Sequence, residues 1–287
     1  MTDFSLWAPI DNNFDSKQFL YHYTDVEKAI KILFYKKLLF SSLTNVNDTS
    51  EAKAKISFAQ GQGSQADVIK NKINIIKEYI KDNSRFLKML CFSMDSEEII
   101  ENVNSPKWMH FDRYRDLIGR GLALPRMWAQ YAKNFTGVCL IFNRDKLLKE
   151  VSNSTAIFYD GKVNYNDFFE SYKFSIDDIN SLYNMISMKS NGRQVFTKMF
   201  QQNDAFIRYN FFSKLNDWKG ENEYRILALP DDINYPLEVF NLQTFLDGIV
   251  VGEKMDSAFS YLIQKLANEL HVAVKRLIID SNCTYIE

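Results

Sequence analysis

Short apolar segments with strand character are interspersed with amphipathic helical segments along most of this chain. This pattern constrains the fold more than any other feature of the sequence. Phe19–Thr24 and residues 138–142 have the composition of buried strands, and the apolar spacing after Thr24 predicts a helix that ends near Lys37. Residues 247–279 are predicted to form a strand–helix–strand unit near the end of the chain. Together these segments predict an α+β fold.

Nothing in the sequence marks a domain boundary, so we expect one domain over residues 1–287. The chain has 10 Gly and 5 Pro, and it contains neither an internal repeat nor a low-complexity tract. Residues 1–17 are polar and are predicted to form an N-terminal arm on the surface. Residues 176–215 have helical spacing, are rich in Phe toward their end, and are predicted to form a helical insertion.

Composition and motifs exclude several classes of protein. The net charge is −1 and the longest apolar runs fall short of the roughly 18–20 residues of a membrane span, so we expect a cytoplasmic protein without a membrane partner. Three cysteines without a CxxC pair indicate neither a disulfide framework nor a zinc site. The motifs of zinc proteases, P-loop enzymes, elbow-type serine hydrolases and Rossmann dehydrogenases are absent, and no metal site is predicted.

Three segments carry side chains that suit a binding or catalytic site. The strand at 21–24 places His22 on one face with Thr24, where it is either a core histidine or a functional one. The segment 128–132 has aromatic residues at helical spacing, which more often indicates core packing. In the segment 218–225, strand alternation predicts Glu221, Glu223 and Arg225 on one face, as either an exposed ion-paired edge or an active site with ionised carboxylates.

A fourth feature is a ridge of cations on the helix predicted for residues 66–90. On a charged helix face such residues are most often simply solvated, but they would also suit the phosphate groups of RNA or DNA. The residues of this ridge are Lys77, Lys81, Arg85 and Lys88.

Six landmarks, taken in order, resemble a large bacterial family described as a domain of unknown function. The family has a Y-x-Y-T/S strand, an N-D-x-x-E loop, a C/F-F-S strand, a W-x-x-Y-A helix followed by Gly, a K-x-x-x-W-x-x-E-x-E-Y/W-R segment and an I-x-x-G turn. In this chain the landmarks lie at residues 21–24, 47–51, 91–93, 128–137, 214–225 and 249–252. The resemblance extends over about residues 19 to 255.

That family in turn resembles the ADP-ribosyltransferase superfamily. One subgroup has a His on its first core strand, a Tyr near the nicotinamide and a Glu on a later strand, and another subgroup has that Glu at the end of an E-x-E motif. The resemblance implies an ADP-ribosyltransferase-like split antiparallel sheet core with helical insertions, and NAD as a substrate. The residues that it assigns to NAD binding are His22, Tyr23, Thr24, Ser93 and Tyr131.

The same resemblance assigns the catalytic role to the E-x-E strand. Cleavage of the nicotinamide–ribose bond passes through an oxocarbenium-like state, which a carboxylate stabilises. Glu223 would supply that carboxylate, Glu221 would position or activate the acceptor, and Arg225 would keep both carboxylates ionised.

The function implied is NAD-dependent mono-ADP-ribosyl transfer, without a metal, to a macromolecule that is RNA, DNA or protein. By analogy, such an enzyme would be the toxin of a toxin–antitoxin or phage-defence system, with an antitoxin as a partner. Two alternatives stay open: a non-catalytic binding or sensing module on the same fold, and an NAD glycohydrolase.

Overall fold

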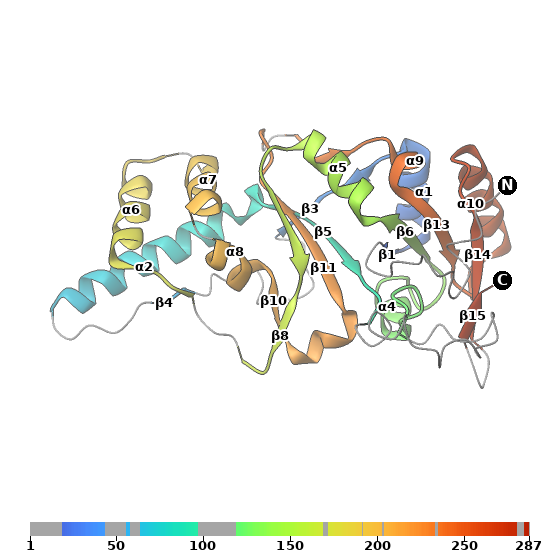
Figure 1. Cartoon of the computed structure of the whole chain (residues 1–287), viewed down its shortest axis with the longest axis horizontal. Helices are drawn as coiled ribbons and strands as arrows, with labels where there is room; N and C mark the ends of the chain where they lie inside the picture. The colour runs from blue at the N-terminus through green and yellow to red at the C-terminus, as the bar shows by residue number, and fades with distance from the viewer. Residues whose placement is uncertain are drawn as a thin grey trace.

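The structure is a computed structural model, and it describes residues 19–43, 56–57, 64–96, 119–168, 172–190, 192–202, 204–232, 235–279 and 284–286. The N-terminal arm expected at residues 1–17 and the landmark at 47–51 lie outside these residues. The described part of the chain mixes helices and strands, as the sequence predicts (Figure 1).

A nine-stranded sheet forms the centre of the molecule. Its strands follow the order β15 (Thr284–Ile286), β14 (Val274–Ile279), β13 (Leu246–Val251), β6 (Val138–Asn143), β1 (Phe19–Thr24), β5 (Lys88–Ser93), β11 (Glu223–Ala228) and β7 (Phe158–Lys162), with β3 (Ser41–Ser42) beside β5. The pairs are antiparallel except β13 with β14, which are parallel and form the strand–helix–strand unit with α10 (Ser257–Glu269). The sheet is therefore mixed, with one parallel pair among antiparallel ones, rather than wholly antiparallel.

The pairing between β1 and its two neighbours is unequal. With β6 it is in register along six residue pairs, from Phe19–Asn143 to Thr24–Val138. With β5 the register pair recorded in the described residues is Tyr21–Ser93. The two halves of the sheet are therefore joined rather than separated, and they meet at a narrow junction between β1 and β5.

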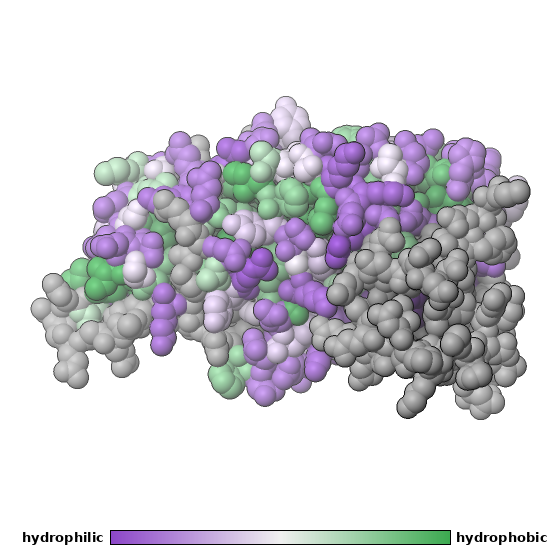
Figure 2. Space-filling model, viewed as in Figure 1, coloured by the Kyte–Doolittle hydropathy of each residue, from purple (hydrophilic) through white to green (hydrophobic). Residues whose placement is uncertain are grey.

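One face of the sheet has an apolar core that extends across this junction. We call it the continuous core, and strand residues such as Leu20, Phe92 and Tyr224 contribute to it. Four helices cover it: α1 (Val26–Tyr35), α5 (Arg144–Ser154), α9 (Leu242–Phe245) and α10. The exposed side of α5 is hydrophilic in Figure 2, while its Leu147 and Val151 are buried.

The opposite face carries two separate apolar cores. The helical-lobe core packs on β5 and β11 and consists largely of side chains from α2 (Ser64–Asn83), α6 (Ile176–Ser187), α7 (Gly192–Gln202) and α8 (Asp204–Phe211). The α4 core packs on β1 and β6 and includes Trp128 of α4 (Pro125–Gln130) with Tyr21 and Tyr23. Figure 1 shows the helical lobe at one end of the molecule and α10 at the other.

The segment 176–215, expected to be a helical insertion, contains α6, α7 and α8. It ends as a strand, β10 (Ser213–Leu215), which is followed by the 3-10 helix η6 (Asn216–Glu221). The remaining short elements are η4 (Ser84–Phe86), β8 (Asn164–Asn166), which pairs with β10, and the strand pairs β2 (Leu38–Leu39) with β12 (Glu238–Val239) and β4 (Ile56–Ser57) with β9 (Tyr172–Lys173). Among the described residues, no helix has the length and apolar content that crossing a membrane requires.

Candidate active site: a buried cluster of charges

Four charged side chains lie together on the face of the sheet that carries the two separate cores. Lys214, Glu221, Glu223 and Arg225 are 5%, 2%, 5% and 1% exposed, and we call them the charged cluster. Arg225 contacts the carbonyl of Phe211 in the helical lobe, and the half-buried Tyr131, beside the α4 core, contacts Glu221. The cluster therefore links the two cores on this face.

Arg225 and Glu223 form a bidentate ion pair on β11. Nε and Nη2 of Arg225 donate to Oε1 and Oε2 of Glu223 at 2.7 and 2.9 Å. The two residues are two positions apart on one strand, so their side chains project from the same face, as the sequence predicts. Burial by itself would raise the pKa of Glu223, but the charges of Arg225 and Lys214 outweigh it and lower this pKa to about 2.

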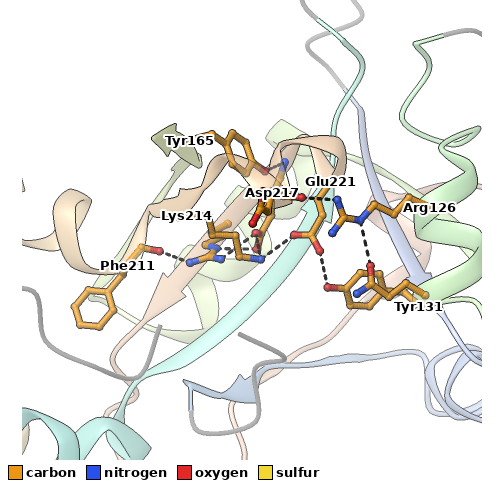
Figure 3. Close-up of polar contacts among 10 residues, drawn as sticks. Arg126, Tyr131, Tyr165, Phe211, Lys214, Asp217 and Glu221 are labelled. Atoms are coloured by element: carbon orange, nitrogen blue, oxygen red, sulfur yellow. Dashed lines mark hydrogen bonds and ion pairs between the residues drawn. The ribbon is translucent and has the colours of Figure 1, made fainter. Parts of the chain in front are cut away.

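Lys214 bridges the two carboxylates of the cluster. Its Nζ lies 2.7 Å from Oε2 of Glu221 and 2.8 Å from Oε2 of Glu223 (Figure 3). It also lies 5.1 Å from the centre of the Trp218 ring. Lys214 was not among the predicted site residues, although the landmark at 214–225 begins with it.

Glu221 reaches the cluster by a different route from the one predicted. It is the last residue of η6, and Asn222 follows it with a left-handed backbone, φ 44°. The predicted strand alternation therefore begins at Glu223, and Glu221 joins it through a turn. Glu221 Oε1 accepts a hydrogen bond from the Tyr131 hydroxyl at 2.7 Å (Figure 3).

Ser93 lies in the same row of the sheet as Glu223. It is in register with Glu223 on one side and with Tyr21 on the other, so the three side chains project from one face. Ser93 is fully buried, and its hydroxyl has no hydrogen-bond partner among the described residues. The structure thus places Ser93 beside Glu223 of the charged cluster.

His22 lies on the other face of the sheet. It follows Tyr21, which shares its row with Ser93 and Glu223, so alternation turns His22 away from the cluster. Its Nδ1 lies 3.0 Å from the carbonyl oxygen of Cys91, and its ring meets Phe92 edge-on at 5.8 Å. The resemblance placed His22 and Glu223 in one site, and the register of the strands separates them.

The two residues that follow His22 also differ in orientation. Tyr23 faces the α4 core, where its hydroxyl donates to the carbonyl of Gly121 at 2.6 Å and accepts from the amide of Leu124 at 3.3 Å. Thr24 is buried and in register with Val138, on the face of His22. Of these two residues, only Tyr23 lies on the face of the charged cluster.

The cation ridge is divided among three elements. The apolar spacing predicted a helix to residue 90. The helix α2 ends at Asn83 instead, and η4 and then β5 follow. Lys77 and Lys81 are on α2, Arg85 is in η4 and Lys88 is on β5. Lys81 is exposed and lies 3.5 Å from Glu78, as on an ordinary solvated helix face. The continuous ridge that sequence spacing predicts is therefore absent.

A second buried ion pair, which the sequence did not reveal, lies beside Tyr21. Asp95 accepts from Arg120 Nη1 at 3.1 Å and from the amide of Gly121 at 2.8 Å. Burial raises the pKa of Asp95, while Arg120 and the Gly121 amide oppose this. Within the described residues, no group of three or more His, Cys, Asp or Glu has a geometry that could hold a metal ion.

Comparison with known protein families gives one match, which covers part of the chain. Residues 127–226 match DUF2971, a protein family of unknown function. The DUF2971 segment contains Tyr131 and the whole charged cluster, and it ends within β11. The landmarks at 21–24, 47–51, 91–93 and 249–252 lie outside the DUF2971 match. Neither curated proteins nor solved structures yield a match to the chain.

Proposed function

We propose that this protein is an NAD-dependent mono-ADP-ribosyltransferase whose carboxylates are Glu221 and Glu223. The observation that carries the proposal is the contact of the Tyr131 hydroxyl with Glu221 at 2.7 Å. This contact lies beside Glu223, which is in register with Ser93. These residues come from distant parts of the chain, and the resemblance assigned all of them to one site. His22 is not part of the proposed NAD site, because it lies on the other face of the sheet.

The charges of the cluster suit the bond that would be broken. In NAD the bond between ribose C1′ and the nicotinamide nitrogen breaks, its electron pair leaves with nicotinamide, and an acceptor nucleophile bonds to C1′ and gives up a proton. Positive charge develops on the ribose in the transition state, and a fixed carboxylate nearby lowers its energy. The low pKa of Glu223 keeps that carboxylate ionised at neutral pH.

The roles of the two carboxylates follow from their contacts. Glu223 is held by Nε and Nη2 of Arg225 and by Nζ of Lys214, so the orientation of its carboxylate is fixed before substrate binds. Glu221 contacts the half-buried Tyr131, and we assign to it the proton that the acceptor releases. The class of acceptor and a toxin–antitoxin role remain predictions from the resemblance.

The test is an incubation with NAD labelled in its adenylate part, with and without cell extract. We expect release of nicotinamide and transfer of label to a macromolecule, and a loss of turnover on the order of 100-fold in Glu223→Gln. Glu238→Gln is the matched control, because Glu238 forms an ion pair with Lys37 outside the cluster. Full activity of Glu223→Gln would refute the proposed mechanism.

A second candidate function is a binding module without turnover. Each carboxylate oxygen of the cluster already accepts a hydrogen bond from Tyr131, Lys214 or Arg225, as in a structural ion network. In that case NAD stays intact in the same incubation. Release of nicotinamide without labelled product would instead identify an NAD glycohydrolase.

A further inference from the structure

We propose that Lys214 is the positioning residue that holds Glu221 and Glu223 together as one ionised pair. The proposal rests on the proposed function for its role in catalysis, but its electrostatic part can be tested without NAD. Nζ of Lys214 contacts Oε2 of both carboxylates, at 2.7 and 2.8 Å. The two oxygens therefore lie within two hydrogen-bond lengths of each other.

Two carboxylates this close repel each other unless a cation lies between them. Without that cation one of them would hold a proton at higher pH, as in other paired carboxylates. Arg225 is directed to Glu223 and to the carbonyl of Phe211. Lys214 is in direct contact with Glu221, and it is the group that also reaches Glu223.

On α4 the charged neighbour is Arg126, which donates to the carbonyl of Asp217 at 2.6 Å, and two hydroxyl groups also lie beside the pair. Tyr131 donates to Glu221 from the end of α4. Tyr165 of β8 accepts from the backbone amide of Glu223, and burial raises its pKa well above its ordinary value. Neither hydroxyl can replace the ammonium group of Lys214.

The surroundings of Lys214 fix its ammonium group. Its backbone is in register with Tyr165 in the parallel pair β10–β8, and its Nζ lies over the Trp218 ring. The side chain is 6% exposed, so water screens its charge only weakly. A buried, pre-positioned cation of this kind sets both the separation and the ionisation of the two carboxylates.

The first experiment is the pH profile of NAD cleavage. Lys214→Met should move the acid limb of the profile upward by about one to two pH units, because the two carboxylates then repel each other. Lys214→Arg keeps the charge and should retain the acid limb near its wild-type position. Lys37→Met removes a cation from a single ion pair outside the cluster and should leave the acid limb of the profile unchanged.

The second experiment measures coupling without NAD, by urea unfolding at neutral pH. Lys214→Met should lower the unfolding midpoint much less when Glu221→Gln is also present, because one carboxylate has then lost its charge. If Lys214→Met alone does not fold, two other comparisons of the unfolding midpoint decide the question. One is Glu221→Gln against the double variant Lys214→Met/Glu221→Gln, and the other is wild type against Lys214→Arg. Equal losses in both backgrounds would overturn the role of Lys214.

The two experiments separate the two proposals. A wild-type protein that leaves NAD intact refutes the proposed function, while the coupling of Lys214 with Glu221 still decides the electrostatic role. An unchanged acid limb in Lys214→Met, in an enzyme that cleaves NAD, refutes the role of Lys214 alone.

Discussion

Replacement of Glu223 by Gln should destabilise the protein in a pH-dependent way. The pKa of Glu223 falls from 4.5 to about 2 in the folded protein. One pKa unit corresponds to about 1.4 kcal/mol, so the ionised form contributes about 3 kcal/mol to stability at pH 7. Glu223→Gln removes the charge and leaves the guanidinium of Arg225 without its bidentate partner, so the full contribution is lost.

The sign of the pH dependence follows from the direction of the shift. A carboxyl with a lowered pKa in the folded state stabilises the protein fully above its unfolded pKa, here 4.5, and that stability is lost as pH falls toward about 2. The difference between Glu223→Gln and wild type should therefore be constant from about pH 7 to about pH 5 and shrink below that.

Urea unfolding followed by tryptophan fluorescence measures this difference at each pH. Glu78→Gln is the control, because Glu78 is 69% exposed and its ion pair with Lys81 contributes little. A loss below about 1 kcal/mol at pH 7, or a loss that does not decrease at low pH, would show that the ion pair does not stabilise the fold as we argue.

Three further predictions concern single contacts. Tyr131→Phe removes the donor to Glu221 and should cost about 1 to 3 kcal/mol in urea unfolding. Gly252→Ala places a Cβ 2.1 Å from the carbonyl oxygen of Phe135, so we expect a loss of about 1 to 3 kcal/mol and a lower melting temperature. Burial lowers the pKa of His22, so wild type should lose stability as pH falls below about 6.5, and His22→Asn should show a smaller change between about pH 7.5 and about pH 5.5.

Each of these has an outcome that contradicts it. Tyr131→Phe with wild-type stability would mean that Glu221 finds another donor. Gly220→Ala is the control for Gly252→Ala, because its Cβ meets Arg126 atoms at an ordinary 3.6 Å; equal losses in both would remove the steric argument. Parallel pH curves for wild type and His22→Asn would show that His22 does not titrate differently on folding.

Local patterns in the sequence predicted the elements of this fold better than their arrangement. Apolar spacing located β1, β6 and the final strand–helix–strand unit, because period and burial are local properties. Alternation also predicted that His22 and Thr24 share a face. Which face holds the charged cluster depends on the register of Tyr21 with Ser93 and of Ser93 with Glu223, and no local pattern encodes that register.

The candidate site was only partly visible for a similar reason. Glu223 and Arg225 form an i, i+2 pair on a strand, which alternation predicts. Lys214 lies on β10, and the 3-10 helix η6 separates β10 from β11, so the strand period does not relate the direction of Lys214 to that of Glu223. The helix predicted to residue 90 ended at Asn83, because apolar residues that continue the spacing there belong to η4 and β5.

The unequal packing of the two sheet faces has a consequence for motion. On one face of the sheet the continuous core joins both halves across the β1–β5 junction. On the other face two separate cores are linked by charged side chains. We expect the lowest-energy motion to be a hinge about the continuous core, with the largest displacement on the charged side. Amide hydrogens of β1 that face β5 should then exchange with solvent sooner than those that face β6.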